Sequence, residues 1–263
     1  MRIEPGTRAI VTGASRGIGR ATAQALARRG ARVGLIARDE DALAELADEL
    51  GGDSIVLGAD VADRASIEAA VARFVEQAGG IELAIANAGL AHYGPFLDQP
   101  IEHAEEMVRV NVLGTVYTVR AAVGPMLDRA AGHVVVVSSG AGLRAFPWGA
   151  VYGATKAADR GFAEALRHEL SGTGVSVSTV FPGEVATSLH DHQRDKLPDW
   201  RRDENTIEAE QVAEAIVDVV ERDRREAHVP GAVRALGLNG LAPRLTDRLV
   251  AAMRGPAAAP RRD

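Results

Sequence analysis

Tyr152 and Lys156 are the two residues whose types and spacing point most directly to chemistry. They lie four positions apart in a stretch whose pattern predicts a helix over 152–170, so both side chains fall on one helix face. A lysine cation there stabilises a phenolate and lets the tyrosine give or take a proton at a carbonyl or hydroxyl oxygen. The chain has three tyrosines, and of its 30 basic residues only Lys156 and Lys196 are lysines. Composition alone therefore does not explain this pair, and we predict that Tyr152 is a proton donor or acceptor.

A glycine-rich turn from Thr12 to Gly19 is the second candidate site. It lies between a predicted strand at 8–12 and a predicted helix at 20–29, where a helix N-terminus offers unpaired N–H groups to an anion. A tight connection without a ligand is the alternative, but the position after the first strand favours a nucleotide phosphate. The residues predicted to bind it are Gly13, Ser15, Arg16, Gly17, Ile18 and Gly19.

The end of the second predicted strand, at 32–37, indicates which dinucleotide binds. Arg38 follows this strand directly, and an arginine there pairs with the 2′-phosphate of NADP, with Arg16 as a second guanidinium. Asp39 comes next and could instead bind the ribose of NAD if the strand ended one residue later. We predict NADP as the cofactor, with NAD as the alternative.

Short apolar runs alternate with helical stretches along most of the chain. Continuous apolar strands that alternate with helices indicate a parallel sheet covered on both faces. The fold class is therefore α/β, a doubly wound parallel sheet of the Rossmann type. We expect a single domain over 1–255, with a mobile substrate loop at 190–205, and a disordered tail over 256–263. Further strands are predicted at 54–57, 83–86, 134–137, 175–180 and 227–230, and further helices at 41–50, 66–78, 101–131 and 210–222.

Taken together, residues 7–188 resemble the short-chain dehydrogenase/reductase family in its single-domain branch. The glycine turn has this branch's three-then-one glycine spacing, and Tyr152, Lys156 and Ser139, thirteen residues before the tyrosine, resemble its catalytic residues. The resemblance implies that Ser139 and Tyr152 bind the substrate oxygen, that Lys156 holds the nicotinamide ribose, and that Asn111 serves a proton relay through a water on its backbone. Ser138 is the adjacent alternative to Ser139. The resemblance also implies cofactor contacts for Asp60, Val61, Asn87, Ala88, Gly89, Pro182, Gly183 and Thr187.

Composition excludes several other classes of function. The 263 residues carry a formal net charge of −6 and few aromatic residues, which argues against a nucleic-acid partner. There is no cysteine, and we predict no metal site, although His190 and His192 stand close together. No run approaches the ~20 apolar residues that span a bilayer, so we expect no membrane anchor and a cytoplasmic location.

The predicted function is an NADP-dependent oxidoreductase that interconverts a carbonyl and an alcohol. Loops at 90–96, 144–148 and 184–200 should wall the substrate pocket, and their aromatic residues favour an apolar small molecule, although Arg144 could meet a carboxylate. The alternative is a regulatory or scaffold protein that binds NAD(P) without turnover. The long helices at 101–131 and 152–170 resemble those that pair across two-fold axes in the family, so we expect a homodimer or homotetramer.

Overall fold

The computed structural model contains a seven-stranded parallel sheet in the order β3-β2-β1-β4-β5-β6-β7. It describes residues 1–51, 53–186, 206–240, 243–244 and 247–248. The order reverses between β1 and β4, and this is the point at which doubly wound sheets bind ligands at the carboxyl ends of their strands. The strands are β1 (Arg8–Thr12), β2 (Arg32–Ala37), β3 (Ile55–Gly58), β4 (Leu83–Ala86), β5 (Gly132–Val137), β6 (Val175–Pro182) and β7 (Glu226–Val229).

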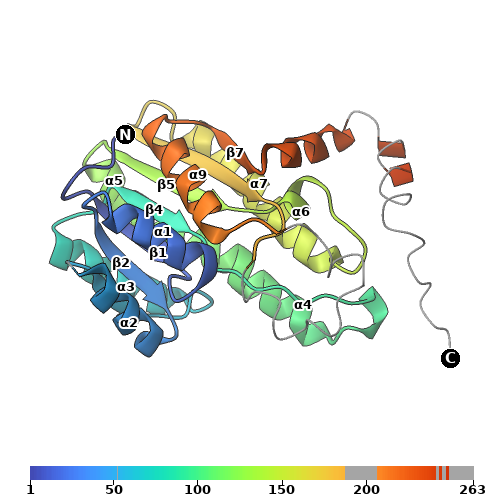
Figure 1. Cartoon of the computed structure of the whole chain (residues 1–263), viewed down its shortest axis with the longest axis horizontal. Coiled ribbons are helices and arrows are strands. Elements are labelled where there is room, and N and C mark those ends of the chain that lie inside the picture. Colours follow the sequence, from blue (N-terminus) through green and yellow to red (C-terminus); the bar gives the residue numbers. More distant parts are fainter. Residues whose placement is uncertain (52, 187–205, 241–242, 245–246, 249–263) are drawn as a thin grey trace.

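Helices cover both faces of this sheet (Figure 1). Side chains alternate along β1, so that Ala9 and Val11 pack into one apolar core and Ile10 packs into the other. The first core includes α1 (Gly17–Ala27), α2 (Glu40–Leu50) and α9 (Ala209–Glu221). The second includes α3 (Arg64–Ala78), α5 (Gly114–Asp128) and α7 (Ala150–Glu169). The doubly wound α/β fold predicted from the sequence is confirmed.

The long helix expected over 101–131 is wrong as a single element. The structure divides it into α4 (Ile101–Met107), the π-helical segment η2 (Val108–Leu113) and α5. A π-helical turn inserts a residue into the hydrogen-bonding pattern and is common at functional positions. Asn111 lies in η2, so the interruption falls at a predicted site residue.

Shorter elements complete the described part of the chain. The 3₁₀ segment η1 (Phe96–Asp98) precedes α4, and the one-turn helix α6 (Gly140–Leu143) follows β5. The 3₁₀ segment η4 (Gly231–Gly240) follows β7. The predicted loop at 190–205 and tail at 256–263 lie outside the described residues, as does the His190–His192 pair. Among the helices that the structure describes, none has the length and apolar character needed to cross a bilayer.

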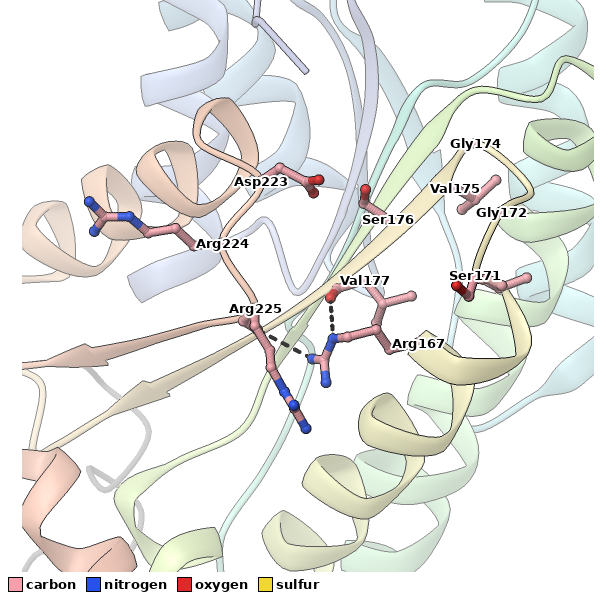
Figure 2. A pocket seen from close by; sticks show the side chains of 11 residues that line it. Arg167, Ser171, Gly172, Gly174, Val175, Ser176, Val177, Asp223, Arg224 and Arg225 are labelled. Carbon is pink, nitrogen blue, oxygen red and sulfur yellow. Dashed lines mark hydrogen bonds between the residues drawn. The ribbon is translucent and has the colours of Figure 1, made fainter.

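A hollow of about 360 Å³ lies at the amino ends of β6 and β7. Figure 2 shows Arg167 there, donating from Nε to the Val177 carbonyl (2.9 Å) and from a terminal nitrogen to the Arg225 carbonyl (3.2 Å). The side chain of Arg225 pairs with Glu164 at 3.2 Å. The cations around this hollow are thus engaged by the protein itself, at the edge of the sheet opposite the predicted catalytic residues.

Candidate active site

The predicted catalytic residues come from three elements at the carboxyl edge of the sheet. Ser139 is the second residue after β5 and caps α6, Tyr152 and Lys156 lie on α7, and Asn111 lies in η2. The Lys156 ammonium contacts β5, because it donates to the carbonyl of Val137 (3.0 Å). The fold therefore brings α7 and the end of β5 together where the sequence predicted a site.

Tyr152 lies in a small apolar cluster separate from the two main cores. Its side chain is buried beside Ala91, Met107 and Ala141, and the edge of its ring meets Tyr93 with the ring centroids 5.6 Å apart. Within the described part of the chain its hydroxyl makes no hydrogen bond. The phenol is thus held by packing, and its oxygen is left to bind another molecule.

Lys156 is buried and engaged by fixed partners. Its Nζ donates to Val137 O and, at 2.9 Å, to Oδ2 of Asp159, which is only 1% exposed. A Cβ added at Gly89 would lie 3.6 Å from this Nζ, so the loop after β4 passes close to the ammonium. Burial by itself lowers the pKa of Lys156, but the Coulombic effects of Asp159 and Tyr152 and the hydrogen bond to Asp159 together outweigh it, and the pKa is raised. The site therefore holds a stable buried cation.

Asn111 links the backbone of the loop after β4 to a side chain of α7. Its Oδ1 accepts from Leu90 N–H (2.8 Å), and its Nδ2 donates to Leu90 O (2.9 Å) and to the hydroxyl of Thr155 (3.0 Å). Its own carbonyl accepts from Thr115 Oγ1 at 2.7 Å. The water that the family resemblance implies would share this carbonyl with the Thr115 hydroxyl.

The two adjacent serines have different surroundings. The Ser138 hydroxyl is buried and donates to the carbonyl of Lys156 (2.8 Å), so it is used inside the protein. Ser139 is partly exposed, and its Oγ accepts from Ala141 N–H (3.1 Å) as the cap of α6. An accepting hydroxyl keeps its own proton for donation. The geometry favours Ser139 over Ser138 as the residue that meets a ligand.

The glycine turn leaves the start of α1 without a side-chain cap. Asp39 and Asp63 cap α2 and α3, but at α1 the cap residue is Arg16 and its side chain makes no such bond. Gly13 and Gly17 adopt positive φ (68° and 55°), which favours glycine, and partly exposed Ser15 and Ile18 complete the turn. The turn thus presents N–H groups of the kind that bind phosphate.

Crowding explains the third glycine of this turn. A Cβ at Gly19 would lie 2.1 Å from the carbonyl oxygen of Gly13 and 2.7 Å from Asn87 Nδ2. The Asn87 amide also donates to the carbonyl of Thr12 (2.9 Å), while N–H groups of Asn87 and Ala88 donate to the Thr12 hydroxyl. The segment 87–89 therefore braces the glycine turn from β4.

The residues predicted to select the cofactor lie beside this turn. Strand β2 ends at Ala37, so Arg38 follows it as predicted, and the exposed guanidinium groups of Arg38 and Arg16 make no ion pair with described residues. Asp39 is occupied differently, since its carboxylate accepts from Ala42 N–H (3.0 Å) as the cap of α2.

The remaining predicted cofactor contacts also follow strands. Asp60 comes after β3, is partly exposed and accepts from Ala62 N–H (2.9 Å). Val61 packs against Gly114, because a Cβ added at Gly114 would lie 2.9 Å from Cγ2 of Val61. Pro182 ends β6, and Gly183 donates to Val229 O (2.7 Å). Thr187 lies outside the described residues.

The model of the short chain dehydrogenase family matches residues 7–198. The chain belongs to the short-chain dehydrogenase/reductase family. It is therefore an oxidoreductase, and the family predicted from its motifs is confirmed. An uncharacterised oxidoreductase of Staphylococcus epidermidis is 33% identical over 213 residues, which cover 80% of this chain and 88% of the relative.

The fold is similar to that of solved dehydrogenase structures. A short-chain dehydrogenase/reductase from Burkholderia phymatum in complex with NAD has a TM-score of 0.84 at 27% identity, covering 100% of both chains. An alcohol dehydrogenase from the archaeon Thermococcus sibiricus, complexed with 5-hydroxy-NADP, has a TM-score of 0.75 at 30% identity, covering 84% of this chain and 94% of that one.

Sequence reasoning missed three residues around the predicted site. Asp159 and Thr115 are polar residues on helices, which their sequence context alone does not mark as buried, yet they are 1% and 5% exposed. Gly142 lies where α6 meets α7, because a Cβ there would be 2.5 Å from the carbonyl oxygen of Lys156. Helical spacing could have indicated Asp159, which stands three residues after Lys156 on the same face.

Proposed function

We propose that the protein interconverts a carbonyl and an alcohol on an apolar small molecule, with NADP(H) as its cofactor. The observation that carries the proposal is the pairing on α7 of a buried Tyr152, whose hydroxyl makes no hydrogen bond among the described residues, with the buried cation of Lys156. Such a tyrosine can donate a proton to an oxygen that gains negative charge.

The side chains divide the work of reduction among them. A bound nicotinamide would supply a hydride to the carbonyl carbon, and the side chains would bind the substrate oxygen and deliver its proton. Ser139 and Tyr152 donate hydrogen bonds to the substrate oxygen, and Tyr152 transfers its proton there as the alcohol forms. Lys156 keeps its positive charge nearby and stabilises the phenolate that remains until it regains a proton from solvent. Oxidation runs through the same groups in reverse.

The surroundings of the glycine turn fit a dinucleotide phosphate and favour NADP over NAD. The uncapped start of α1 and the positive φ of Gly13 and Gly17 suit a pyrophosphate. Arg38 and Arg16 are exposed and without ion pairs among the described residues, and Asp39 is already used to cap α2. Because two guanidinium groups suit a 2′-phosphate, we assign them to NADP.

The loops beside Tyr152 support an apolar substrate. Tyr93 and Phe146 come from two of the predicted pocket walls, and their ring centroids lie 6.0 Å apart. The N–H of Gly94 donates to the carbonyl of Trp148 (3.0 Å), which joins the same two loops. Arg144, the cation considered for a substrate carboxylate, pairs with Asp247.

A substrate series with both cofactors tests this function. Matched ketones and aldehydes of rising polarity are incubated with NADPH and with NADH, and absorbance loss at 340 nm is followed. We expect faster turnover with NADPH and with the more apolar carbonyls, and the variant R38D should reverse the cofactor preference. Activity that rises with substrate polarity would contradict the apolar site, and NADPH binding without turnover on any carbonyl would favour a regulator.

Self-association is proposed on the exposed apolar residues of one helical region. Ile101 and Val108 are 66% and 42% exposed on α4 and η2, and Leu113 at the end of η2 is 37% exposed. Burial of these side chains against a second copy would remove them from water. We therefore propose a homodimer or homotetramer, to be tested by light scattering after size-exclusion chromatography of wild type and I101K/V108K.

A further inference from the structure

We propose that Asp159 is a positioning residue that holds Lys156 as an oriented cation, an inference that rests on the proposed function of Lys156. The two side chains lie three residues apart on the buried face of α7, and Lys156 Nζ donates to Asp159 Oδ2 at 2.9 Å. Their side chains are 6% and 1% exposed. An ion pair with so little access to water is far less screened than one on a surface.

The hydrogen bonds of the ammonium fix its direction. Lys156 has three N–H donors, of which one goes to Asp159 and one to the carbonyl of Val137 (3.0 Å). A third donor remains for the proposed cofactor. Because two acceptors are built into α7 and β5, the ammonium is oriented before any ligand arrives.

Asp159 is itself held by a group from the neighbouring helix. The Thr115 hydroxyl on α5 lies within reach of the Asp159 carboxyl and of the Asn111 carbonyl, 2.7 Å away, and its single proton can be donated to either. Burial raises the pKa of Asp159; the charge of Lys156 and the Thr115 hydroxyl oppose that effect without cancelling it, so the pKa stays raised. The positioning residue is thereby linked through Thr115 to η2, where Asn111 fixes the loop after β4.

The groups that face Lys156 show why Asp159 matters. Among the described residues the titratable groups that act on its ammonium are Asp159 and Tyr152, both on α7. Other packed elements present only uncharged groups: the Val137 carbonyl on β5, the Gly89 backbone after β4, the Asn111 amide on η2 and the Thr115 hydroxyl on α5. Without Asp159, burial would favour a neutral amine at Lys156.

A titration of Lys156 itself tests this directly. The chain has only two lysines, so the variant K196R leaves one ¹⁵N-labelled side-chain amine for NMR. In the K196R protein we expect the Lys156 ammonium to lose its proton only above the ordinary lysine pKa of about 10.4. Adding D159N, which keeps the shape and removes the charge, should lower the midpoint by about one pH unit or more. Equal midpoints, or no titration in either protein while both stay folded, would overturn the proposal.

The pH profile of reduction supplies the second readout. In D159N the alkaline fall of kcat/KM should begin about one pH unit lower than in wild type. On that limb, kcat/KM of D159N at a given pH should therefore be about tenfold below that of wild type. If Asp159 had a purely structural role, D159N would lower kcat/KM by the same factor at every pH. D223N is the matched control, because it removes an exposed carboxylate at the opposite edge of the sheet, and its limb should not move.

T115V keeps the test available if D159N does not fold. It removes the hydroxyl beside Asp159 and leaves the ion pair. The Lys156 titration midpoint and the alkaline limb of kcat/KM should therefore move to lower pH, as in D159N, but by a smaller amount. T115V behaving as wild type in both measurements would contradict the proposal in that case. The NMR titration uses neither substrate nor cofactor, so it tests Asp159 even if the protein reduces no carbonyl.

Discussion

At the carboxyl edge of the sheet Lys156 is buried against a carboxylate 2.9 Å away, whereas at the amino edge His133 is buried against a serine hydroxyl. His133 is 1% exposed, and its Nε2 lies 2.7 Å from Ser178 Oγ, with Asp223 no nearer than 3.9 Å. Burial lowers the pKa of His133 to about 4, which Asp223 opposes only weakly. Lys156 is also buried, at 5% exposed, yet its pKa is raised.

The contrast shows that the charge of a buried basic side chain depends more on its hydrogen-bond partner than on how deeply it is buried. A carboxylate at hydrogen-bond distance keeps Lys156 ionised, and a neutral hydroxyl leaves His133 uncharged. The nearby arginines of the amino edge are also engaged, as Figure 2 shows for Arg167. One edge therefore has a persistent charge available for catalysis, and the other has a neutral, structural arrangement.

The largest expected effect comes from removing the cation. K156M leaves the Asp159 carboxylate buried without its partner, and such a loss costs about 3–5 kcal/mol of unfolding free energy. Urea denaturation should show this loss, and K156M/D159L should recover most of it while remaining inactive. A double variant as unstable as K156M would mean that the unpaired charge is not the cause.

Acid should weaken the other edge through His133. Its pKa is about 4 in the folded state and about 6.5 in the unfolded state, so the unfolded chain binds the proton more readily. The stability from this residue is complete above pH 6.5 and falls by roughly 3 kcal/mol as the pH drops to 4. The difference in unfolding free energy between wild type and H133Q, measured across this range, should shrink accordingly. A constant difference would contradict a neutral buried histidine.

A smaller effect is expected where α6 touches α7. G142A would place a Cβ 2.5 Å from the carbonyl oxygen of Lys156, and the forced shift should cost about 1–3 kcal/mol and lower kcat. G161A, on α7, is the matched control, because no atom lies within 4 Å of the added Cβ. It should gain up to about 1 kcal/mol, since alanine favours a helix. Equal melting temperatures for the two variants would exclude the crowding.

The smallest effect belongs to the surface pair at the amino edge. Arg225 and Glu164 are each about half exposed, at 54% and 49%. R225A should change the unfolding free energy by less than about 1 kcal/mol and leave kcat unchanged. A kcat that falls in R225A would show that this edge contributes to the reaction after all.

Local pattern predicted most of the fold. The strands begin and end within two residues of their predicted bounds, because buried parallel strands are continuous apolar runs. The division of the helix at η2 was not predicted; this segment contains Asn111, whose side chain bonds the backbone of Leu90, 21 residues earlier.

The same limit applies to the site. The spacing of Tyr152 and Lys156 in the sequence predicts a functional pair, and the structure places both on one buried face of α7. The sequence does not mark Asp159 in this way, because a carboxylate in an amphipathic helix ordinarily faces water. Its burial follows from the packing of α7 against β5 and α5.

We propose that Tyr152 at the carboxyl edge of the sheet delivers the proton in carbonyl reduction and that His133 at the amino edge takes no part. The most direct test is to follow NADPH oxidation with the best apolar ketone for wild type, Y152F and H133Q at pH 7. We predict that Y152F loses about 10²–10⁴ in kcat while still binding NADPH, and that H133Q retains wild-type turnover. Turnover by Y152F at the wild-type rate would contradict the account.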